Sequence, residues 1–271
     1  MEINFSKLTA AGNDFVLIDN RNDIVPKENY QFLAKKLCDR KYSIGADGLI
    51  LLENSENKDF KMKYLNSDGS HACMCGNGGR SVARFAYDLG IVGSKMVFET
   101  DAGVINAEIL SQNTVKLGLY IPKDLKQNIK LQVQDKNFNL DFINTGVPHV
   151  VVFVDDAESV DVFKYGRLIR NSEIFSPQGT NVNFVQVLDK NKLLVRTYER
   201  GIEGETLACG TGITASGIIS VLKGFAKSPV KIVSRSGNEL SVSFDIDSSL
   251  QISNVVLEGP AIISFKGVIN I

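Results

Sequence analysis

The sequence has no tryptophan and contains only two histidines, four cysteines and six prolines among its 271 residues. Four cysteines at irregular spacings are too few for a disulfide scaffold in a chain of this length, so we expect free thiols and a reducing, cytoplasmic setting. No apolar run approaches the ~20 residues that span a bilayer, and the first residues lack the apolar stretch of a signal peptide. A membrane is therefore not expected as a partner.

Neither sign of charge is in excess, because 30 lysines and arginines stand against 31 aspartates and glutamates. The net charge of −1 gives no basic field for nucleic acid, which is therefore not an expected partner. A hydrophobic content of 44% and a charged content of 23% are ordinary for a globular protein. The length exceeds that of a usual single core, which predicts two domains of roughly 130 residues each.

An internal repeat with a constant offset organises the sequence. The run Cys75–Gly78 (Cys-Gly-Asn-Gly) has a counterpart in Cys209–Gly212 (Cys-Gly-Thr-Gly), 134 positions later. The same offset relates Gly12 to Gly146, Gly45 to Gly179, Tyr64 to Tyr198, Gly90 to Gly224, Gly103 to Gly237, and Val16–Ile18 to Val150–Val152. Seven matches that share one ungapped offset indicate two homologous halves of about 134 residues.

Each half is expected to place one helix directly after its Cys-Gly-x-Gly turn. In the first half this helix has an apolar face that includes Val82, Phe85 and Leu89 and ends near Gly90. In the second half Ile213–Leu222 is apolar almost all round, so we expect that helix to be deeply buried. A further short helix is expected at residues 30–38.

Strands are expected to outnumber these helices. Apolar or alternating runs predict strands at residues 15–18, 96–100, 150–153 and 230–234. The pattern predicts an α+β fold of two pseudo-symmetric, sheet-rich domains, each with one central helix. Pro122 and the phase of the repeat place the domain boundary near residues 118–123. We expect residues 1–119 with 263–271 to form one half and residues 120–262 the other.

Each half places a cysteine immediately before its predicted central helix. At such a position unpaired backbone N–H groups point outward and the helix dipole is positive, which lowers the pKa of a thiol. The neighbouring glycines let the backbone approach a ligand closely, so the turn can also hold a carboxylate. If the halves face each other about a pseudo-two-fold axis, Cys75 and Cys209 converge on one cleft.

Two matched cysteines suit the inversion of a stereocentre by proton transfer. The reaction needs a base on one face of a carbon and an acid on the other, and a thiolate and a thiol exchange these roles in the reverse direction. Both helix N-termini can stabilise the negative charge that develops at an α-carboxylate as the α-proton leaves. The residues indicate an amino-acid epimerase that needs neither a cofactor nor a metal.

Other interpretations of these motifs stay open at this point. A single cysteine is usually a buried small hydrophobe, which we expect for Cys38 and Cys73. Residues 71–75 (His-Ala-Cys-Met-Cys) could form a metal or redox cluster in a non-catalytic protein, although no second Cys/His knuckle of the kind zinc sites use is present. The glycine turns could bind phosphate, but neither matches a P-loop or a dinucleotide-binding motif.

Five groups of motifs, taken together, resemble the diaminopimelate epimerase family. They are Phe5-Ser6-Lys7 with Gly12-Asn13-Asp14-Phe15, Asn66-Ser67-Asp68-Gly69-Ser70, Cys75-Gly76-Asn77-Gly78-Gly79-Arg80, Tyr198-Glu199-Arg200-Gly201 and Ala208-Cys209-Gly210-Thr211-Gly212. The resemblance extends in order from residue 5 to the C-terminus. It implies a cofactor-independent isomerase that interconverts LL-2,6-diaminopimelate and its meso isomer on the route to lysine and peptidoglycan. It also implies two barrel-like domains, each around a central helix, with the active site in the cleft between them.

The resemblance implies roles for individual residues as well. Cys75 and Cys209 match the two catalytic cysteines, while His149 and Glu199 match residues that support them. The substrate-binding positions are Asn13, Asn66, Gly76, Asn77, Asn181, Glu199, Arg200, Gly210 and Thr211. In chemical terms Arg200 can bind a carboxylate through two parallel hydrogen bonds, and Glu199 can accept from an ammonium group. Asn13 and Asn66 also lie where asparagine often only shapes a turn.

Two positions depart from the family pattern. Val147 follows Gly146 where many members have asparagine, and Gly48 stands where some have glutamine. Both departures concern contacts to the distal end of the substrate rather than the proton-transfer pair. The resemblance also implies a homodimer, with Phe265 where some members use tyrosine at the dimer contact.

Two related enzyme classes remain as alternatives. Proline and hydroxyproline racemases usually have Gly-His after the first cysteine, whereas this chain has Gly76-Asn77. Phenazine-type isomerases lack the cysteine pair. Isotope exchange with each candidate substrate distinguishes these classes from a diaminopimelate epimerase.

Overall fold

The computed structural model describes residues 2–134 and 136–271. The chain divides into two compact units, residues 1–118 with 258–271 and residues 119–257. The boundaries expected from the sequence fall one residue later at the first crossing and five residues later at the second. Strand β16 (Ile252–Pro260) carries the chain from the second unit back into the first.

The first unit is rich in strands and has two α-helices in its described part. Its elements are β1 (Glu2–Ala10), β2 (Asn13–Asp19), the 3₁₀ turn η1 (Lys27–Asn29), α1 (Tyr30–Cys38), β3 (Gly48–Glu53), β4 (Phe60–Asn66), α2 (Gly76–Asp88), β5 (Lys95–Thr100), β6 (Gly103–Ile109), β7 (Thr114–Gly118) and β17 (Ile262–Asn270).

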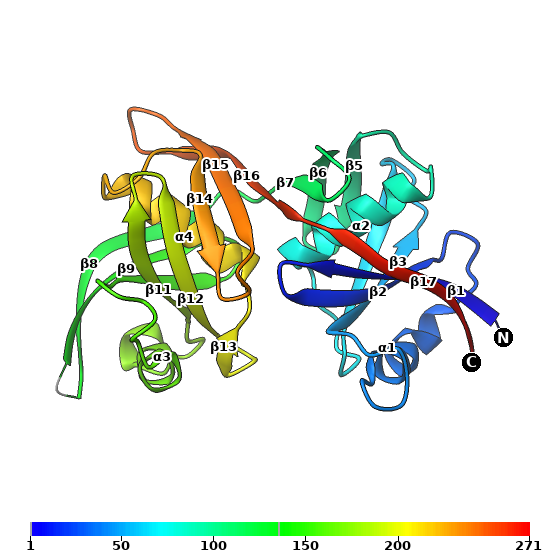
Figure 1. The fold of residues 1–271 in the computed structure, drawn as a ribbon, viewed down its shortest axis with the longest axis horizontal. Helices are drawn as coiled ribbons and strands as arrows, with labels where there is room; N and C mark the ends of the chain where they lie inside the picture. The colour runs from blue at the N-terminus through cyan, green and yellow to red at the C-terminus, as the bar shows by residue number, and fades with distance from the viewer. Residues whose placement is uncertain (1, 135) are drawn as a thin grey trace. The chain divides into compact units, whose positions relative to one another are not determined.

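The strands of the first unit form a sheet that curls around helix α2. The strands pair in the order β17, β1, β2, β3, β4, β5, β6, β7, with β2/β3 and β4/β5 parallel and the other pairs antiparallel. Helix α2 contacts strands from both ends of this order, including β17, β1, β6 and β7, so it lies inside the curl (Figure 1). Helix α1 packs on the opposite face, in a cluster with Leu49 and Leu51, while Ile50 points towards Gly78 of α2.

The second unit has the same architecture. Its elements are β8 (Lys123–Val133), β9 (Lys136–Asn144), β10 (Pro148–Phe153), α3 (Val162–Arg170), the 3₁₀ turn η2 (Glu173–Phe175), β11 (Asn181–Asp189), β12 (Lys192–Glu199), β13 (Gly204–Thr206), α4 (Gly210–Leu222), β14 (Val230–Ser234) and β15 (Glu239–Ile246). The strands pair in the order β8, β9, β10, β11, β12, β14, β15, with β10/β11 and β12/β14 parallel and with β13 on β12. Helix α4 contacts β9, β10, β11, β12, β14 and β15 and lies inside this sheet (Figure 1).

The predicted repeat is confirmed by the element boundaries. Strands β1 and β9 begin and end 134 residues apart, and so do helices α2 and α4. The parallel and antiparallel pairs also follow one another in the same sequence in both units. Gly12 and Gly146 have φ angles of 101° and 112°, and Gly90 and Gly224, just past the two central helices, have 70° and 74°. Both glycine pairs therefore recur because the same left-handed backbone recurs. The α+β class with two repeated, sheet-rich domains is confirmed.

The two central helices are buried in different ways. Helix α2 combines an apolar face with the buried side chains of Asn77 and Arg80, whereas α4 buries every residue from Gly212 to Ser220. The hydroxyls inside α4 are satisfied by carbonyls one turn earlier, as in Ser216 to Gly212 (2.8 Å) and Ser220 to Ser216 (2.7 Å). In the described part of the chain no helix is long and apolar enough to cross a membrane.

Candidate active site

Cys75 is the N-cap residue of helix α2. Its backbone is extended (φ −138°, ψ 124°), its side chain is partly buried, and the chain reaches it through the turn that follows β4. The first N–H groups of an α-helix have no carbonyl partner one turn earlier, so they can bind an anion. No acidic residue stands in the first turn of α2 to compete for them.

Cys209 occupies the same position on helix α4. It is also an extended N-cap residue (φ −111°, ψ 109°), its exposed fraction is 8%, and the first turn of α4 again lacks an acidic residue. Both predicted cysteines thus lie at helix N-termini, as the repeat leads one to expect. Gly76, Asn77, Gly210 and Thr211 form the first turns of the two helices.

A hydrogen-bond network fixes the side chain of Asn77 behind Cys75. The Nδ2 of Asn77 donates to Oδ1 of Asn13 (2.6 Å), and the Nδ2 of Asn13 donates to Asp47 (2.9 Å). On its other side, Asn77 Oδ1 accepts from Arg80 Nη2 (2.6 Å). Asn13 and Asn77 therefore lie together at one site, and both amides are held by protein groups.

Arg80 is a fully buried guanidinium inside the first unit. Besides Asn77 it faces the carbonyl oxygens of Gly76 (3.4 Å) and Pro260 (3.3 Å), and among the described residues no carboxylate lies within ion-pair distance of it. Burial lowers the pKa of Arg80 to about 10, and the negative charge of a Cys75 thiolate acts in the opposite direction. Arg80 remains charged at neutral pH, so it supplies a buried positive charge near Cys75.

A cluster of charges supports the Asn13 end of this network. Asp14 forms ion pairs with Arg40 (2.6 Å) and Lys7 (2.9 Å), and Arg40 also reaches Asp47 (2.8 Å). Burial by itself would raise the pKa of Asp14, but the hydrogen bonds and charges of Arg40 and Lys7 lower it to about 2. Asp14 is thus ionised at neutral pH, and the cluster holds the start of β2, and hence Asn13, in place.

In the second unit a chain of polar side chains leads to Cys209. Thr211 Oγ1 lies 3.4 Å from Cys209 Sγ and 2.9 Å from His149 Nε2. His149 Nδ1 in turn lies 3.2 Å from Asn183 Nδ2. His149 and Asn183 are fully buried. The structure therefore brings His149, Thr211 and Cys209 together.

His149 is neutral at physiological pH. Burial lowers its pKa to about 3, and the positive charge of Arg200 acts in the same direction. A neutral imidazole has one donating and one accepting nitrogen. His149 can therefore accept a hydrogen bond at one ring nitrogen and donate one at the other while it stays uncharged.

The remaining predicted substrate contacts lie at the ends of strands. Asn66 ends β4, and its amide donates to Ser70 Oγ (2.9 Å) within the following turn. Asn181 begins β11, and its side-chain amide binds two backbone groups. Its Nδ2 donates to the carbonyl oxygen of Pro148 (2.8 Å), and its Oδ1 accepts from the backbone N–H of Arg200 (2.9 Å). Glu199 ends β12 and is partly buried, and Arg200 follows it and donates to the carbonyl of Gln178 (3.1 Å). These residues therefore lie at or directly after strand ends, with Asn66 in the first unit and the other three in the second.

The structure shows the surroundings of Gly48 and Val147, the two positions that depart from the family pattern. A Cβ atom at Gly48 would lie 2.5 Å from the ring of Tyr64 and 2.7 Å from the carbonyl oxygen of Leu65, so no side chain fits there while Tyr64 keeps its place. Val147 is partly buried in the turn before His149. It has no polar group with which to replace an asparagine amide.

The other cysteines and the metal hypothesis can be placed as well. Cys38 is buried, and burial raises the pKa of its thiol to about 12, as expected for a structural thiol. Cys73 is exposed, so the expectation that it is buried was wrong; it lies in the turn before α2 rather than in an element that packs on the core. Within residues 2–134 and 136–271, no three His, Cys, Asp or Glu side chains are grouped to hold a metal ion.

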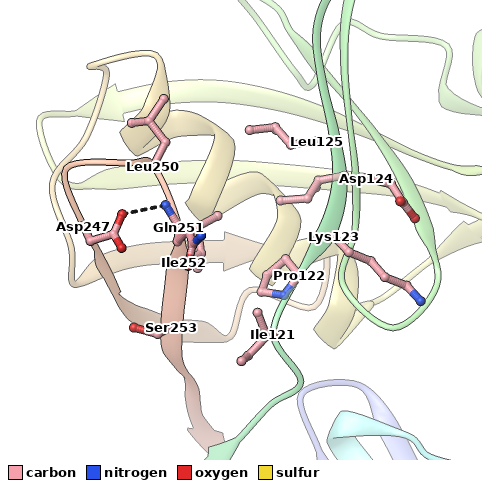
Figure 2. A pocket seen from close by; sticks show the side chains of 11 residues that line it. Ile121, Pro122, Lys123, Asp124, Leu125, Asp247, Leu250, Gln251, Ile252 and Ser253 are labelled. Carbon is pink, nitrogen blue, oxygen red and sulfur yellow. Dashed lines mark hydrogen bonds between the residues drawn. The ribbon is translucent and has the colours of Figure 1, made fainter.

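A surface hollow of about 490 Å³ lies in the second unit, away from all the predicted site residues. Figure 2 shows it between the start of β8 and the turn before β16. The carboxylate of Asp247 at its rim already accepts from the backbone of Gln251 (2.9 Å) and from Ser249. The hollow has apolar walls from Ile121, Leu250 and Ile252, and its lining also includes Lys123, Asp124 and Asp247. None of the predicted site residues lines it.

Sequence reasoning missed Arg80, Asn183 and Thr197. Each is buried and polar, and each contacts a predicted site residue or its partner. Asn181 and Asn183 alternate along β11, and polar residues at alternate positions of an otherwise apolar strand are a signal that could have indicated one buried polar face. Arg80, in the Gly-rich start of α2, gives no such signal.

Comparisons with known proteins agree with one another. The sequence model described as diaminopimelate epimerase matches residues 5–120 and 142–263. A protein named diaminopimelate epimerase from Aquifex aeolicus is 48% identical over 276 aligned positions, which cover 97% of this chain and 96% of that protein.

Among solved structures, a phenazine biosynthesis protein of the PhzF family from Bacillus anthracis has the same fold, with a TM-score of 0.79 at 16% identity over the full length of both chains. A hydroxyproline epimerase from Agrobacterium vitis follows, with a TM-score of 0.72 at 12% identity over 99% of this chain and 92% of that one. At such identities these two similarities concern the fold alone. The match over most of the sequence, by contrast, places the chain in a family: it belongs to the diaminopimelate epimerases.

Proposed function

We propose that this chain is an isomerase that interconverts LL-2,6-diaminopimelate and meso-diaminopimelate, on the route to lysine and peptidoglycan. The observation that carries the proposal is the pair of cysteines, Cys75 and Cys209, each the N-cap of one of two repeated central helices. The family and its relatives, such as the protein that is 48% identical, support the choice of substrate.

In the proposed reaction one cysteine thiolate takes the α-proton from one face of the substrate carbon. The other cysteine, as a thiol, gives a proton to the opposite face, so the configuration inverts and the two roles are exchanged. The backbone N–H groups of Gly76-Asn77 and Gly210-Thr211 bind the α-carboxylate and stabilise the charge that grows there. Thiols alone serve as acid and base, so the scheme involves no cofactor.

The proposal gives the remaining polar residues two tasks. His149 and Glu199 support the catalytic thiols, with His149 acting through the Thr211 hydroxyl, which lies 3.4 Å from Cys209 Sγ. The other substrate contacts are assigned to Asn13, Asn66, Asn181, Glu199 and Arg200. The guanidinium of Arg200 suits the distal carboxylate of diaminopimelate, because it can form two parallel hydrogen bonds with it.

The deciding experiment is α-proton exchange in D₂O with LL-diaminopimelate, proline and histidine offered separately. We expect deuterium at the α-carbon of diaminopimelate only, together with formation of the meso isomer. Exchange into proline without exchange into diaminopimelate would reject the proposed substrate.

Serine variants of the cysteines test the two-base mechanism. Cys75→Ser and Cys209→Ser should each lower epimerisation by at least about 100-fold, because a serine hydroxyl is a far weaker acid and base than a thiol. Cys73→Ser, a change at the exposed cysteine of the same turn, serves as the matched control and should keep most of the activity. Full activity in either of the first two variants would end the two-base mechanism.

We further propose that the protein is a homodimer in the cytoplasm. Strand β17 presents three exposed apolar side chains, Ile262, Phe265 and Val268, and the ring of Phe265 packs edge-on against Phe5 at 6.0 Å. Light scattering should give about twice the mass of the chain, and Phe265→Glu should give the monomer. The four free thiols support a reducing compartment.

A further inference from the structure

The second unit buries a polar cluster that the proposed proton transfer does not by itself explain. Asn183 is fully buried on β11, and its Nδ2 donates to the carbonyl oxygen of Val150 (2.9 Å) and faces His149 Nδ1 (3.2 Å). Its Oδ1 accepts from the hydroxyl of Thr197 (2.9 Å), which lies directly opposite Asn183 in the register of β11 and β12. Every polar atom of the amide is thus engaged inside the protein.

These contacts fix which way the amide of Asn183 points. The carbonyl oxygen of Val150 can only accept a hydrogen bond, so the nitrogen of the amide, and not its oxygen, has to face it. The same nitrogen then presents its second N–H to His149 Nδ1. Because that ring nitrogen faces a donor, it has to be the accepting, unprotonated nitrogen. The single proton of the neutral ring therefore lies on Nε2.

The direction of the remaining hydrogen bonds follows from this tautomer. The Nε2–H of His149 donates to Thr211 Oγ1 at 2.9 Å. Since Thr211 Oγ1 accepts that bond, its own O–H is left to donate to Cys209 Sγ at 3.4 Å. A donor at this position stabilises the thiolate relative to the thiol.

We propose that Asn183 is a positioning residue that locks His149 as the neutral Nε2–H tautomer and so makes the Thr211 hydroxyl a donor to the Cys209 thiolate. The role of that thiolate as a catalytic base rests on the proposed function, whereas the direction of the hydrogen bonds does not.

The repeat shows that this device belongs to one cysteine only. At the offset of 134 residues the first half has Leu49 in place of Asn183 and Phe15 in place of His149, and neither can form such a chain. The packing around the device is equally specific. A Cβ atom at Gly212 would lie 2.3 Å from Asn183 Oδ1, so the second glycine of the Cys209 turn leaves the space that Asn183 fills.

The tautomer can be measured directly by ¹⁵N NMR of the histidine ring. The chain has two histidines, so His71→Asn, a change at an exposed position, leaves His149 as the single signal. At neutral pH we expect Nδ1 to resonate as an unprotonated nitrogen and Nε2 as a protonated one. A proton on Nδ1 would overturn the proposal, and this result needs no substitution in the core.

Asn183→Asp should reverse the direction of the hydrogen bonds between His149 and Thr211. A carboxylate accepts where the amide donated, so the ring proton should move to Nδ1, and Nε2 should then accept from Thr211. Cys209 would lose the donor that Thr211 supplies. Its alkylation by iodoacetamide at neutral pH, measured by peptide mapping, should slow roughly tenfold. Cys75 in the same sample is the internal reference and should react at its original rate.

Two further variants separate this role from packing and from charge. Asn183→Leu, which copies Leu49 of the first half, removes the donor without adding a charge and should also slow Cys209 alkylation. Val185→Ala, two residues along the same buried strand, loses packing but should keep both the tautomer and the Cys209 rate. Unchanged readouts in folded Asn183→Asp and Asn183→Leu would reject the positioning role.

Neither readout uses diaminopimelate. If NMR finds the expected tautomer but diaminopimelate shows no isotope exchange, the proposed function alone is rejected. If diaminopimelate exchanges as expected but NMR finds the proton on Nδ1 of His149, the positioning role of Asn183 alone is rejected.

Discussion

The second glycine of each cysteine turn meets different neighbours in the two units. A Cβ atom at Gly78 would lie 3.2 Å from the terminal methyl group of Met62 and 3.3 Å from that of Ile50, both at the ends of flexible side chains. At Gly212 it would lie 2.3 Å from Asn183 Oδ1, which three hydrogen-bond partners of the amide hold in place. The same glycine of the motif therefore has neighbours that can move at Gly78 and neighbours that are held in place at Gly212.

Alanine substitutions should reveal this difference as stability. Gly212→Ala should lower the free energy of unfolding by about 1–3 kcal/mol, because it overpacks a rigid site. Gly78→Ala should change it by less than about 1 kcal/mol, because alanine favours the helix and Met62 can move. Urea denaturation of both variants measures the two values, and equal losses would contradict this account.

Single residues also show where sequence reasoning reaches its limit. The positions of Cys75 and Cys209 at helix starts followed from spacing and glycine content alone, since both signals are local in the chain. Arg80 and Asn183 act through partners up to 180 positions away, such as Pro260 for Arg80. Such contacts depend on the tertiary fold, which no local pattern specifies.

At the scale of elements, the N-terminal parts of α2 and α4 differ by one buried charge. Arg80 on α2 corresponds to Thr214 on α4, whose hydroxyl only returns to the carbonyl of Gly210 (2.9 Å). The buried guanidinium favours a thiolate at Cys75, while Cys209 receives its stabilising donor from Thr211. The two helix N-termini therefore stabilise their thiolates by different means.

Removing the charge from α2 should affect only the cysteine of that helix. Arg80→Met, which keeps a long buried side chain, should slow alkylation of Cys75 several-fold at neutral pH, because a nearby positive charge favours the thiolate. Thr214→Val is the matched change on α4 and should leave alkylation of Cys209 nearly unchanged. Circular dichroism would confirm that both variants are folded, and an unaltered Cys75 rate in Arg80→Met would show that the guanidinium does not act on the thiol.

The elements themselves were predictable to different degrees. Helix α1 spans residues 30–38 as expected, and the apolar parts of α2 and α4 were located correctly. The sequence predicted a Cys-Gly-x-Gly turn that leads into the helix, whereas α2 already starts at Gly76. Gly76, Gly78 and Gly79 have low helix propensity, so packing stabilises them there. The pairing of β17 with β1 joins the two ends of the chain, so no local signal could indicate it.

For the whole molecule, the repeat explains the architecture but not the distribution of buried polar groups. Tyr64 and Tyr198 occupy equivalent core positions, yet Phe15 in the first unit corresponds to His149 in the second. A buried histidine couples the stability of its unit to pH, whereas a phenylalanine does not. The two halves of a symmetric fold should therefore respond differently to acid.

This asymmetry leads to a prediction for the pH dependence of folding. The pKa of His149 is about 3 in the folded chain and 6.5 as its ordinary value, so below pH 6.5 the unfolded state binds a proton that the folded state does not. Stability should therefore be constant above about pH 7 and fall as the pH is lowered from 6.5 towards 3, with about 2 kcal/mol lost by pH 5.

Urea denaturation between pH 7.5 and 5 tests this prediction in the His71→Asn chain, in which His149 is the single histidine. Aspartates and glutamates with lowered pKa values, such as Asp14 and Glu239, affect stability mainly below their ordinary values of 3.8 and 4.5, so they contribute little between pH 7.5 and 5. Adding His149→Asn should make the profile nearly flat, although the variant is less stable at pH 7.5. An equally steep fall in the double variant would mean that another group takes up the proton, and that His149 is not held neutral by its burial.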